Sequence, residues 1–453
     1  MTQAARLRRW QWVTAGSLFS GYAAYYLCRS NLSVATPILL REFGPHGLTK
    51  ESMGLVASAG VAAYALGKVF NGLLADRLGG RRLFLGGLGA SILCTIVFAL
   101  AGSAWAFTGV AIFVTIWAAN RLVQSAGWVA LVNIASRWFP VSRHATIMAF
   151  LSCSFLVGDA ASRAYLGGLI RLGESQSQLS ALADWRTVFA VSAGTSLVVL
   201  LVLLKLLRAD PGDIGAEEPP ANSANVYANQ DSPGVGAPHD LRQILGPLMR
   251  SRLFWTVCLT NLCLTLVRET FNFWTPTFLT ERVSLSPGAA AAASLTFPLA
   301  GAAAALICGV LSDRLGGRHG RIMVPSILGL ICSLLLLGAM PLDGRPAMAI
   351  FLIGLVALFL MGPYSYLSGV MALDIGGKHG SGTAAGLSDA AGYGGAILSG
   401  HTVGLLAERL GWSSAFYSLA GVSVLGLISA LMYSRCNESL LGRRHTLNPE
   451  SQP

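Results

Sequence analysis

Long apolar segments recur along the chain and are separated by short joints rich in glycine, proline or charged residues. A helix that crosses the hydrocarbon core of a bilayer needs about 20 predominantly apolar residues. Twelve segments are long enough for this, and each predicts one membrane-spanning helix. The expected spans are 11–40, 52–75, 83–102, 105–136, 145–170, 188–207, 253–279, 288–311, 322–341, 347–373, 382–406 and 414–433.

The composition excludes an ordinary water-soluble protein. Of the 453 residues, 53% are hydrophobic and 12% are charged, whereas soluble domains carry about 25% charged residues. The first apolar segment follows a basic N-terminus and has no small-residue cleavage site, so it predicts a first membrane helix rather than a signal peptide. The eight cysteines occur singly, without the paired spacing of a metal site or a disulfide framework.

The net charge of +11 comes from 32 Lys and Arg against 21 Asp and Glu. These basic residues gather on alternate joints between the spans, at 6–9, 77–82, 137–143, 205–252, 314–321, 378 and 435–444. An excess of Lys and Arg marks the cytoplasmic loops of a membrane protein. Both termini are therefore expected in the cytoplasm, and the membrane rather than a nucleic acid accounts for the basic balance.

One compositional break divides the chain. Residues 209–250 are rich in proline, asparagine and acidic residues and predict a flexible linker between halves 1–208 and 251–435, with 436–453 as a cytoplasmic tail. The segment GLLADRLGGRR that begins at residue 72 recurs as GVLSDRLGGRHGR from residue 309. Two parallel six-helix halves resemble the major facilitator superfamily, whose substrate site lies near the bilayer midplane between the halves.

The repeated segment suggests a gate. In each copy an aspartate closes a span and arginines open the cytoplasmic joint, so carboxylate and guanidinium groups can pair between helix ends and hold one conformation. The alternative is that the arginines only set the topology. The gating residues predicted on this basis are Asp76, Arg77, Arg81, Asp313, Arg314 and Arg318.

Two arginines lie deep in the apolar segments, where a charge is costly and therefore a candidate for function. Arg29 lies in the first span and Arg268 in the seventh, 239 residues later. This separation is close to that of the repeat, so the two are expected at near-equivalent places facing a central cavity. Arginine suits bidentate binding of phosphate or carboxylate oxygens. The alternative is that Arg268 simply pairs with the adjacent Glu269.

The chain resembles the organophosphate:phosphate antiporter family over nearly all of its length except the linker and tail. The resemblance rests on the segments YYLCRSN, YALGKVFNGLLADR, NRLVQSAGW, VRETFNFWTPTFL and GTAAGLSDAAGYGG. It implies that Arg29 and Arg268 bind the substrate phosphate and that Lys68 lines the same cavity. Tyr26, one helical turn before Arg29, is a candidate hydroxyl ligand.

Several positions depart from the family pattern. Ser30 stands where the family usually has a lysine, and Phe155 stands where a pocket histidine is expected. Asp159 and Arg163 follow Phe155 at steps of four, so the three share one helical face. They form either a structural ion pair or contacts to the organic part of the substrate, or the acid carries a proton. Asp389 follows Asp159 by 230 residues and is the corresponding candidate in the second half.

These observations predict an all-α membrane carrier, not an enzyme, that works by alternating access without a cofactor or metal. The expected function is exchange of a phosphorylated organic anion, of the glycerol phosphate or sugar phosphate class, for inorganic phosphate across the inner membrane. The protein is expected to be a monomer. Two alternatives are open: a proton-coupled symporter of organic anions, and a carrier-like sugar-phosphate sensor.

Overall fold

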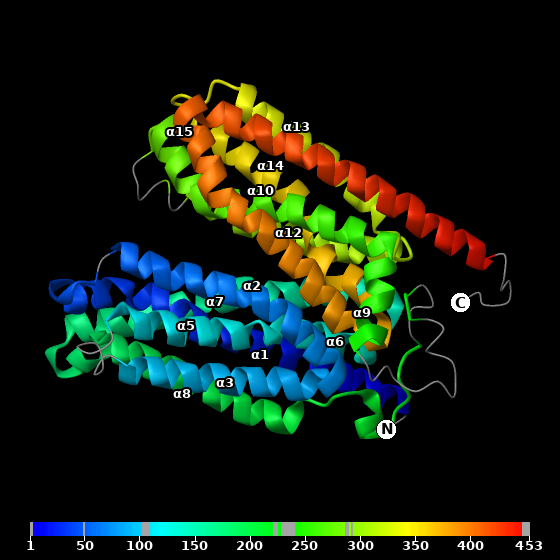
Figure 1. Cartoon of the computed structure of the whole chain (residues 1–453), viewed down its shortest axis with the longest axis horizontal. Coiled ribbons are helices and arrows are strands. Elements are labelled where there is room, and N and C mark those ends of the chain that lie inside the picture. Colours follow the sequence, from blue (N-terminus) through cyan, green and yellow to red (C-terminus); the bar gives the residue numbers. More distant parts are fainter. Residues whose placement is uncertain are drawn as a thin grey trace. The chain divides into compact units, whose positions relative to one another are not determined.

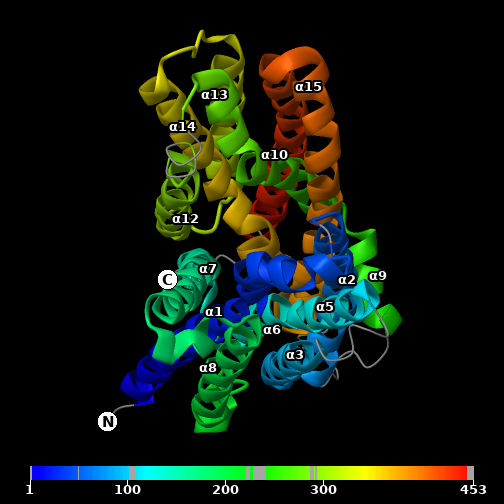
Figure 2. The same cartoon turned by 90° about the vertical axis from the view of Figure 1, so that its left-hand side faces the viewer.

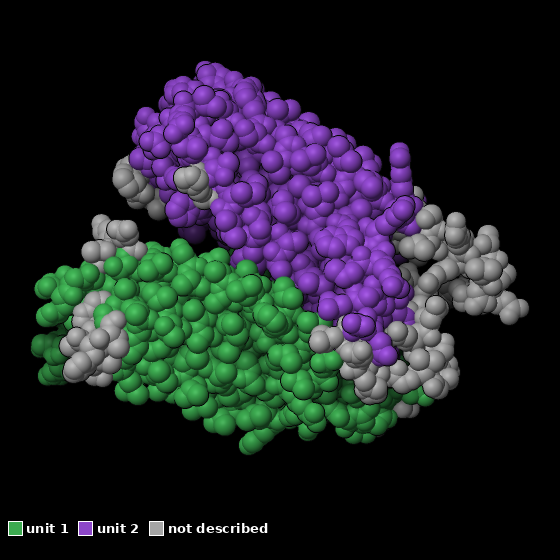
Figure 3. Space-filling view, viewed as in Figure 1, with its two compact units in different colours: residues 1–138, 153–219 green, residues 139–152, 220–453 purple. Residues whose placement is uncertain are grey.

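The computed structural model describes residues 3–48, 50–101, 109–220, 225–227, 241–285, 290 and 293–445, and these are almost entirely helical (Figure 1). The chain divides into two compact units, which Figure 3 shows in different colours. The first unit comprises Met1–Trp138 and Cys153–Pro219, and the second comprises Phe139–Ser152 and Pro220–Pro453. The predicted linker 209–250 and tail 436–453 lie partly outside the described residues, at 221–224, 228–240 and 446–453.

The first unit is a helical bundle in which α2 packs against α5 and α6, and α3 and α1 both pack against α8. Helices α5 and α6 meet at Ser125, and together they form the single span predicted there. The elements are α1 (Gln3–Phe43), η1 (Gly44–His46), α2 (Lys50–Leu78), α3 (Gly80–Ala101), α5 (Val110–Gln124), α6 (Ala126–Trp138), the later part of α7 (His144–Ser175), η4 (Ser177–Ala183), α8 (Trp185–Leu206) and η5 (Pro211–Ile214).

The second unit is also a bundle, in which α10 packs along α15, α12 along α14, and α13 against both α14 and α15 (Figure 2). The elements are η3 (Val141–Arg143), the start of α7, α9 (Leu241–Arg250), α10 (Arg252–Val283), α12 (Thr296–Arg314), α13 (Gly320–Ala339), α14 (Pro346–Ser365), the π-helical turn η6 (Tyr366–Val370) and α15 (Met371–His445).

The 75-residue α15 is not one straight helix. Its backbone leaves helical geometry at Gly377, with φ 55°, and at Gly411, with φ 80°. Positive φ is readily adopted by glycine, which has no Cβ, and is strained for other residues. The first break ends the span that begins with α14, and the second separates the two last spans. Each of the twelve predicted spans is therefore helical over most of its described residues.

Eight helical segments of the described chain are long and apolar enough to cross a membrane by length and composition alone. They do not include α1 or α10, because polar and charged residues lower the mean hydropathy of these two helices. Arg29 lies on α1 and Arg268 on α10. These two long helices are thus the ones that carry the predicted phosphate-binding arginines.

One contact occurs twice, once in each unit. In the first unit, the indole Nε1 of Trp185 donates to Oε2 of Glu42 at 2.8 Å. In the second unit, the indole Nε1 of Trp412 donates to Oε2 of Glu281 at 2.9 Å. Each tryptophan begins the last span of its half, and each glutamate lies near the end of the first span. The same tryptophan–glutamate contact therefore joins the first and last spans in both halves.

This repeated contact fixes the correspondence between the two arginines. Glu42 and Glu281 are 239 residues apart, and so are Arg29 and Arg268. Each arginine therefore lies the same number of residues before the glutamate that ties its helix to the last span of its half. Arg29 and Arg268 occupy equivalent positions in the two repeats.

Candidate functional site

Arg29 of α1 lies among aromatic side chains. Its guanidinium donates from Nη1 to the hydroxyl of Tyr26 at 3.2 Å, and its Cζ lies 4.9 Å from the centroid of that ring. The ring of Tyr64, from α2, lies 5.1 Å from the same Cζ. The ring of Phe155, from α7, lies 6.4 Å from that of Tyr26. The predicted neighbours Tyr26 and Arg29 are therefore in direct contact.

Three cations surround the ring of Tyr64. The distance to the ring centroid is 4.4 Å for the Cζ of Arg121, 5.0 Å for the Nζ of Lys68 and 5.1 Å for the Cζ of Arg29. A cation within about 6 Å of an aromatic centroid is attracted by the electrons of the ring face. Lys68 is 2% exposed, Tyr64 3% and Arg121 4%. Three positive charges from three helices thus meet in one small volume of the first unit.

Sequence reasoning placed Arg29 and Lys68 in the site but did not include Arg121 or Tyr64. The signal for Arg121 was present, because the residue lies near the middle of the span predicted at 105–136. The rule that identified Arg29 as a charge deep in an apolar segment applies equally there. Nothing in the sequence distinguishes Tyr64 from the other tyrosines, since its role follows from where α2 packs.

A buried amide network holds the backbone next to Arg29. Nε2 of Gln124 donates to the carbonyl of Cys28 at 2.8 Å, and Nδ2 of Asn120 donates to the same carbonyl at 3.2 Å. Ser91 of α3 donates to Asn120 at 2.7 Å and accepts from Gln124 at 3.0 Å. Oε1 of Gln124 in turn accepts from Nη1 of Arg121 at 2.9 Å. Three helices are thereby joined directly behind Arg29.

Glycine lets α2 approach α5 closely at this place. A Cβ on Gly60 would lie 2.6 Å from the Trp117 ring and 2.9 Å from Cγ of Arg121, distances that real Cβ atoms essentially never show. Gly60, Tyr64 and Lys68 follow one another at steps of four, so they share one face of α2. The absence of a side chain at residue 60 leaves the space through which Arg121 reaches Tyr64.

The residues that depart from the family pattern form one connected group. Ser30 donates from Oγ to Oδ1 of Asp159 at 2.5 Å, and Nε of Arg163 binds Oδ2 of Asp159 at 3.0 Å. Nη1 of Arg163 also donates to Oγ of Ser33 at 3.0 Å. The side chains of Arg163 and Asp159 are 54% and 38% exposed. The i,i+4 ion pair is therefore formed, and it ties α7 to α1 beside Arg29.

Arg268 in the second unit also contacts a tyrosine. Its Nη1 donates to the hydroxyl of Tyr364, and its Cζ lies 4.7 Å from the centroid of that ring. Its Nη2 pairs with Oε1 of Glu269 at 3.1 Å, with the two side chains 22% and 33% exposed. Asp389 on α15 is half-buried. The pairing of Arg268 with Glu269 that sequence reasoning left open is thus present.

Asp313, one of the predicted gating carboxylates, contacts a helix start. Its two oxygens accept from the backbone N–H groups of Ala145, at 3.1 Å, and Thr146, at 2.8 Å. These groups belong to the first turn of α7, where the positive end of the helix dipole favours an acid. Of the predicted arginines nearby, Arg314 is exposed and Arg318 is half-buried.

Asp76, the corresponding carboxylate of the first half, accepts from Nδ2 of Asn133 at 2.9 Å. Arg81 donates to the carbonyls of Leu207, at 2.7 Å, and Leu204, at 3.0 Å, and so binds the last turn of α8. Arg77, next to Asp76, is exposed. The repeated segment therefore contacts helix ends in both units, and a gating role for its residues stays a prediction.

A buried cluster of two histidines and an aspartate joins three segments of the second unit. Nδ1 of His144 lies 3.0 Å from Oδ1 of Asp374, and Nε2 of His319 lies 2.9 Å from Oδ2. Ser312 Oγ lies 2.7 Å from Nδ1 of His319. Sequence reasoning did not find this cluster, because its members are scattered over 230 residues.

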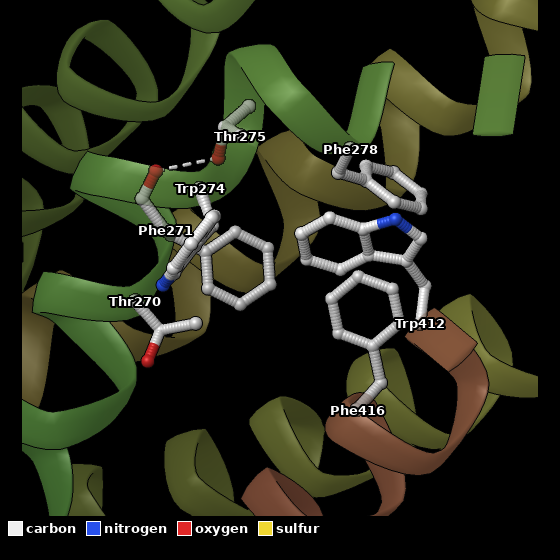
Figure 4. A pocket seen from close by; sticks show the side chains of 7 residues that line it. All are labelled: Thr270, Phe271, Trp274, Thr275, Phe278, Trp412 and Phe416. Carbon is white, nitrogen blue, oxygen red and sulfur yellow. Dashed lines mark hydrogen bonds between the residues drawn. The ribbon is translucent and has the colours of Figure 1, made fainter. Parts of the chain in front are cut away.

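An aromatic cavity in the second unit lies between α10 and α15 (Figure 4). The rings of Phe271, Trp274, Phe278, Trp412 and Phe416 face one another around it. Its volume is about 10 Å³, room for roughly one water molecule. It is far too small for an organic phosphate, so it belongs to the packing of the helices rather than to a substrate site.

Comparison with known proteins identifies the family. Residues 18–400 and 284–446 match the Major Facilitator Superfamily. The chain belongs to this superfamily. It is 26% identical over 415 residues to the glycerol-3-phosphate transporter of Bacillus subtilis. The matched region covers 91% of this chain and 89% of that relative. It is 27% identical over 441 residues to the membrane sensor protein UhpC of Salmonella typhimurium. Here the matched region covers 94% of this chain and 93% of the relative.

The fold agrees with this membership. The Escherichia coli fucose:proton symporter FucP superposes with a TM-score of 0.68 at 15% identity, covering 92% of this chain and 98% of the other. The predicted superfamily fold of two six-helix halves is thereby confirmed, and so is the predicted resemblance to phosphate-ester carriers. The protein is a multi-pass membrane transporter and not an enzyme.

Proposed function

We propose that this protein exchanges a phosphorylated organic anion, of the glycerol phosphate or sugar phosphate class, for inorganic phosphate. The observation that carries the proposal is the group of cations around Tyr64, in which Arg29, Lys68 and Arg121 converge. The relative named a glycerol-3-phosphate transporter supports the same substrate class.

The cation group in the first unit favours an anion on simple electrostatic grounds. Each charged group lies within 5.1 Å of one ring centroid, so any two are at most about 10 Å apart. At an effective dielectric constant near 20, two like charges at this distance repel by about 2 kcal/mol. A phosphate dianion beside them offsets this repulsion, and the planar fork of Arg29 suits two of its oxygens.

Arg268 supplies the second guanidinium of the proposed clamp. It holds the position in the second repeat that Arg29 holds in the first, and carriers of this superfamily bind substrate between their halves. Glu269 already pairs with Arg268, so an incoming phosphate has to displace this carboxylate. The exchange of one anion for another at Arg268 would couple phosphate binding to a rearrangement at α10.

The transport cycle follows from the need to compensate these charges. With an anion bound, the positive charges of the site are compensated and the change to the opposite-facing state becomes easier. An empty site changes state less readily, which gives obligatory exchange. In this scheme Asp76 and Asp313, with the adjacent arginines, stabilise one state through their contacts to helix ends. The carrier would act as a monomer in the inner membrane with both termini in the cytoplasm.

Two other functions would need different chemistry at the site. A proton-coupled symporter would use Asp159, Asp389 or Glu269 as the carboxylate that gains and loses a proton. A sugar-phosphate sensor is favoured by the identity to a protein named as a membrane sensor. Such a sensor would bind the ester without sustained transport.

Reconstitution in liposomes separates these functions. Vesicles loaded with inorganic phosphate and placed in labelled glycerol 3-phosphate should accumulate label, and phosphate inside should accelerate uptake. A protonophore should leave the rate unchanged. Uptake that is abolished by the protonophore and indifferent to internal phosphate would instead identify a symporter. Saturable binding with no uptake in either condition would identify a sensor.

A further inference from the structure

We propose that Asp159 makes this carrier selective for phosphate esters whose organic part bears an ammonium group, such as the phosphate ester of an amino alcohol. The inference rests on the proposed function, since it names a feature of the substrate that the same site accepts. It starts from the charges of the first half. Asp159 is the only aspartate or glutamate within the six spans predicted for that half, where a carboxylate is costly and therefore a candidate for function.

Asp159 lies next to the level of α1 at which Arg29 is held. Helix α7 contacts α1 at three successive levels, about one helical turn apart. These contacts join Phe155 to Tyr26, Asp159 to Ser30, and Arg163 to Ser33. Tyr26 in turn accepts a hydrogen bond from Arg29. Because one turn rises about 5.4 Å, an organic group attached to a phosphate at Arg29 has only about one turn to bridge before it reaches Asp159.

The face of α7 that carries Asp159 is exposed although it lies at membrane depth. Asp159 and Arg163 lie well inside the span predicted at 145–170, and their side chains are 38% and 54% exposed. Charged side chains at this depth face the interior of the bundle or a water-filled cavity rather than lipid, where they would be costly. An exposed charged face at this depth is therefore expected to line the water-filled path of the carrier.

The carboxylate of Asp159 can accept further hydrogen bonds. Its Oδ1 accepts from Oγ of Ser30 and its Oδ2 accepts from Nε of Arg163, and each carboxylate oxygen has two lone pairs. Arg163 divides its donors, because its Nη1 binds Ser33. An ion pair this exposed is weak, so an ammonium group can share or replace the guanidinium at Asp159. Arg29 repels the ammonium and attracts the phosphate, which fixes the direction in which the ester binds.

The competing interpretation is that Asp159 only ties α7 to α1. In that case its loss would affect every ester alike. The proposal requires instead that its effect depend on the charge of the organic group. Phosphoethanolamine and ethylene glycol monophosphate are a suitable pair of probes, because they differ only in an amino group in place of a hydroxyl group. The amino group is protonated near neutral pH, as the amine of a lysine is.

The first measurement uses the parent protein in liposomes loaded with inorganic phosphate. We expect KM for phosphoethanolamine to be about fivefold lower than KM for ethylene glycol monophosphate, which is the effect of one ion pair with a partly exposed carboxylate. Equal KM values, a preference for ethylene glycol monophosphate, or exchange of glycerol 3-phosphate alone would overturn the proposal and leave the proposed function intact. Failure to exchange any of the three esters would overturn the proposed function as well.

The second measurement compares variants by the ratio of the KM for ethylene glycol monophosphate to the KM for phosphoethanolamine. Asp159→Asn should reduce this ratio to near one, whereas Asp159→Glu, which keeps the charge, should retain most of the preference. Arg163→Gln removes the competing guanidinium and should raise the ratio above that of the parent. Glu174→Gln removes an exposed acid of the same helix and serves as the matched control. It should keep the parent ratio.

A double variant keeps the test decisive if Asp159→Asn alone does not accumulate in the membrane. Asp159→Asn combined with Arg163→Gln removes both charges together, so no uncompensated charge is left at membrane depth. Its ratio should also be near one. A parent ratio in the double variant, or an Asp159→Asn variant that raises both KM values by the same factor, shows that Asp159 is structural and refutes the assignment.

Discussion

Glu269→Gln should strengthen phosphate binding. In the structure, Oε1 of Glu269 lies 3.1 Å from Nη2 of Arg268 and so occupies the guanidinium that the proposed clamp needs. A neutral amide of the same shape can still accept this hydrogen bond, but it competes far less with a phosphate dianion. The substitution therefore tests whether Arg268 is a phosphate ligand or only the partner of its neighbour.

The size of the effect follows from the exposure of the pair. The side chains of Arg268 and Glu269 are 22% and 33% exposed. The pair is therefore intermediate between fully exposed ion pairs, which contribute about 0–1 kcal/mol, and buried ion pairs. We take about 1 kcal/mol for the competing interaction, which corresponds to roughly a fivefold change in affinity. KM for phosphate self-exchange should fall by about this factor.

The assay is uptake of labelled phosphate into liposomes loaded with phosphate, over a range of external concentrations. Glu408→Gln removes an exposed acid of α15 and controls for the change in net charge. An unchanged or raised KM in Glu269→Gln, with the control at the parent value, would refute the reasoning that Glu269 competes with phosphate. Phosphate-dependent thermal stabilisation in detergent gives an independent measure of the same affinity.

Four further predictions concern other contacts. Arg29→Lys keeps the charge but loses the planar fork, so phosphate exchange should fall about tenfold or more; near-normal exchange would remove the case for bidentate binding. Lys68→Ala should raise KM for phosphate about tenfold while the protein still accumulates in the membrane, and failure to accumulate would point to a structural role. Asp159→Asn combined with Arg163→Gln should raise KM for phosphate by no more than about threefold, because a pair this exposed contributes about 1 kcal/mol or less; complete loss of exchange would contradict this. Asp374→Asn weakens the contacts to two histidine rings and should lower the free energy of unfolding by about 1–3 kcal/mol, seen as a lower melting temperature in detergent; an unchanged melting temperature would refute it.

The sequence predicted the membrane architecture because hydropathy is a local property. Each span depends on the composition of its own stretch of chain, and a charge within an apolar segment, such as Arg29, stands out against its neighbours. The internal repeat then related Arg29 to Arg268, because two residues separated by the repeat offset are expected at equivalent places in the two copies of the fold. The structure agrees through the contacts of Glu42 and Glu281, which lie the same distance apart in the sequence as the two arginines.

Tertiary structure alone decided which side chains meet. Arg121 of α5 reaches Tyr64 where α2 packs closely on α5 at Gly60, and Arg29 reaches the same ring from α1. Ser30 reaches Asp159 across 129 residues. The physical reason is that the hydrophobic pattern specifies which stretches enter the membrane, whereas the rotation and spacing of neighbouring helices depend on the summed packing of many small contacts between residues far apart in the chain. The sequence pattern therefore predicts the family and the outline of the site. The packing of the helices decides the arrangement of the charges that we propose bind the substrate.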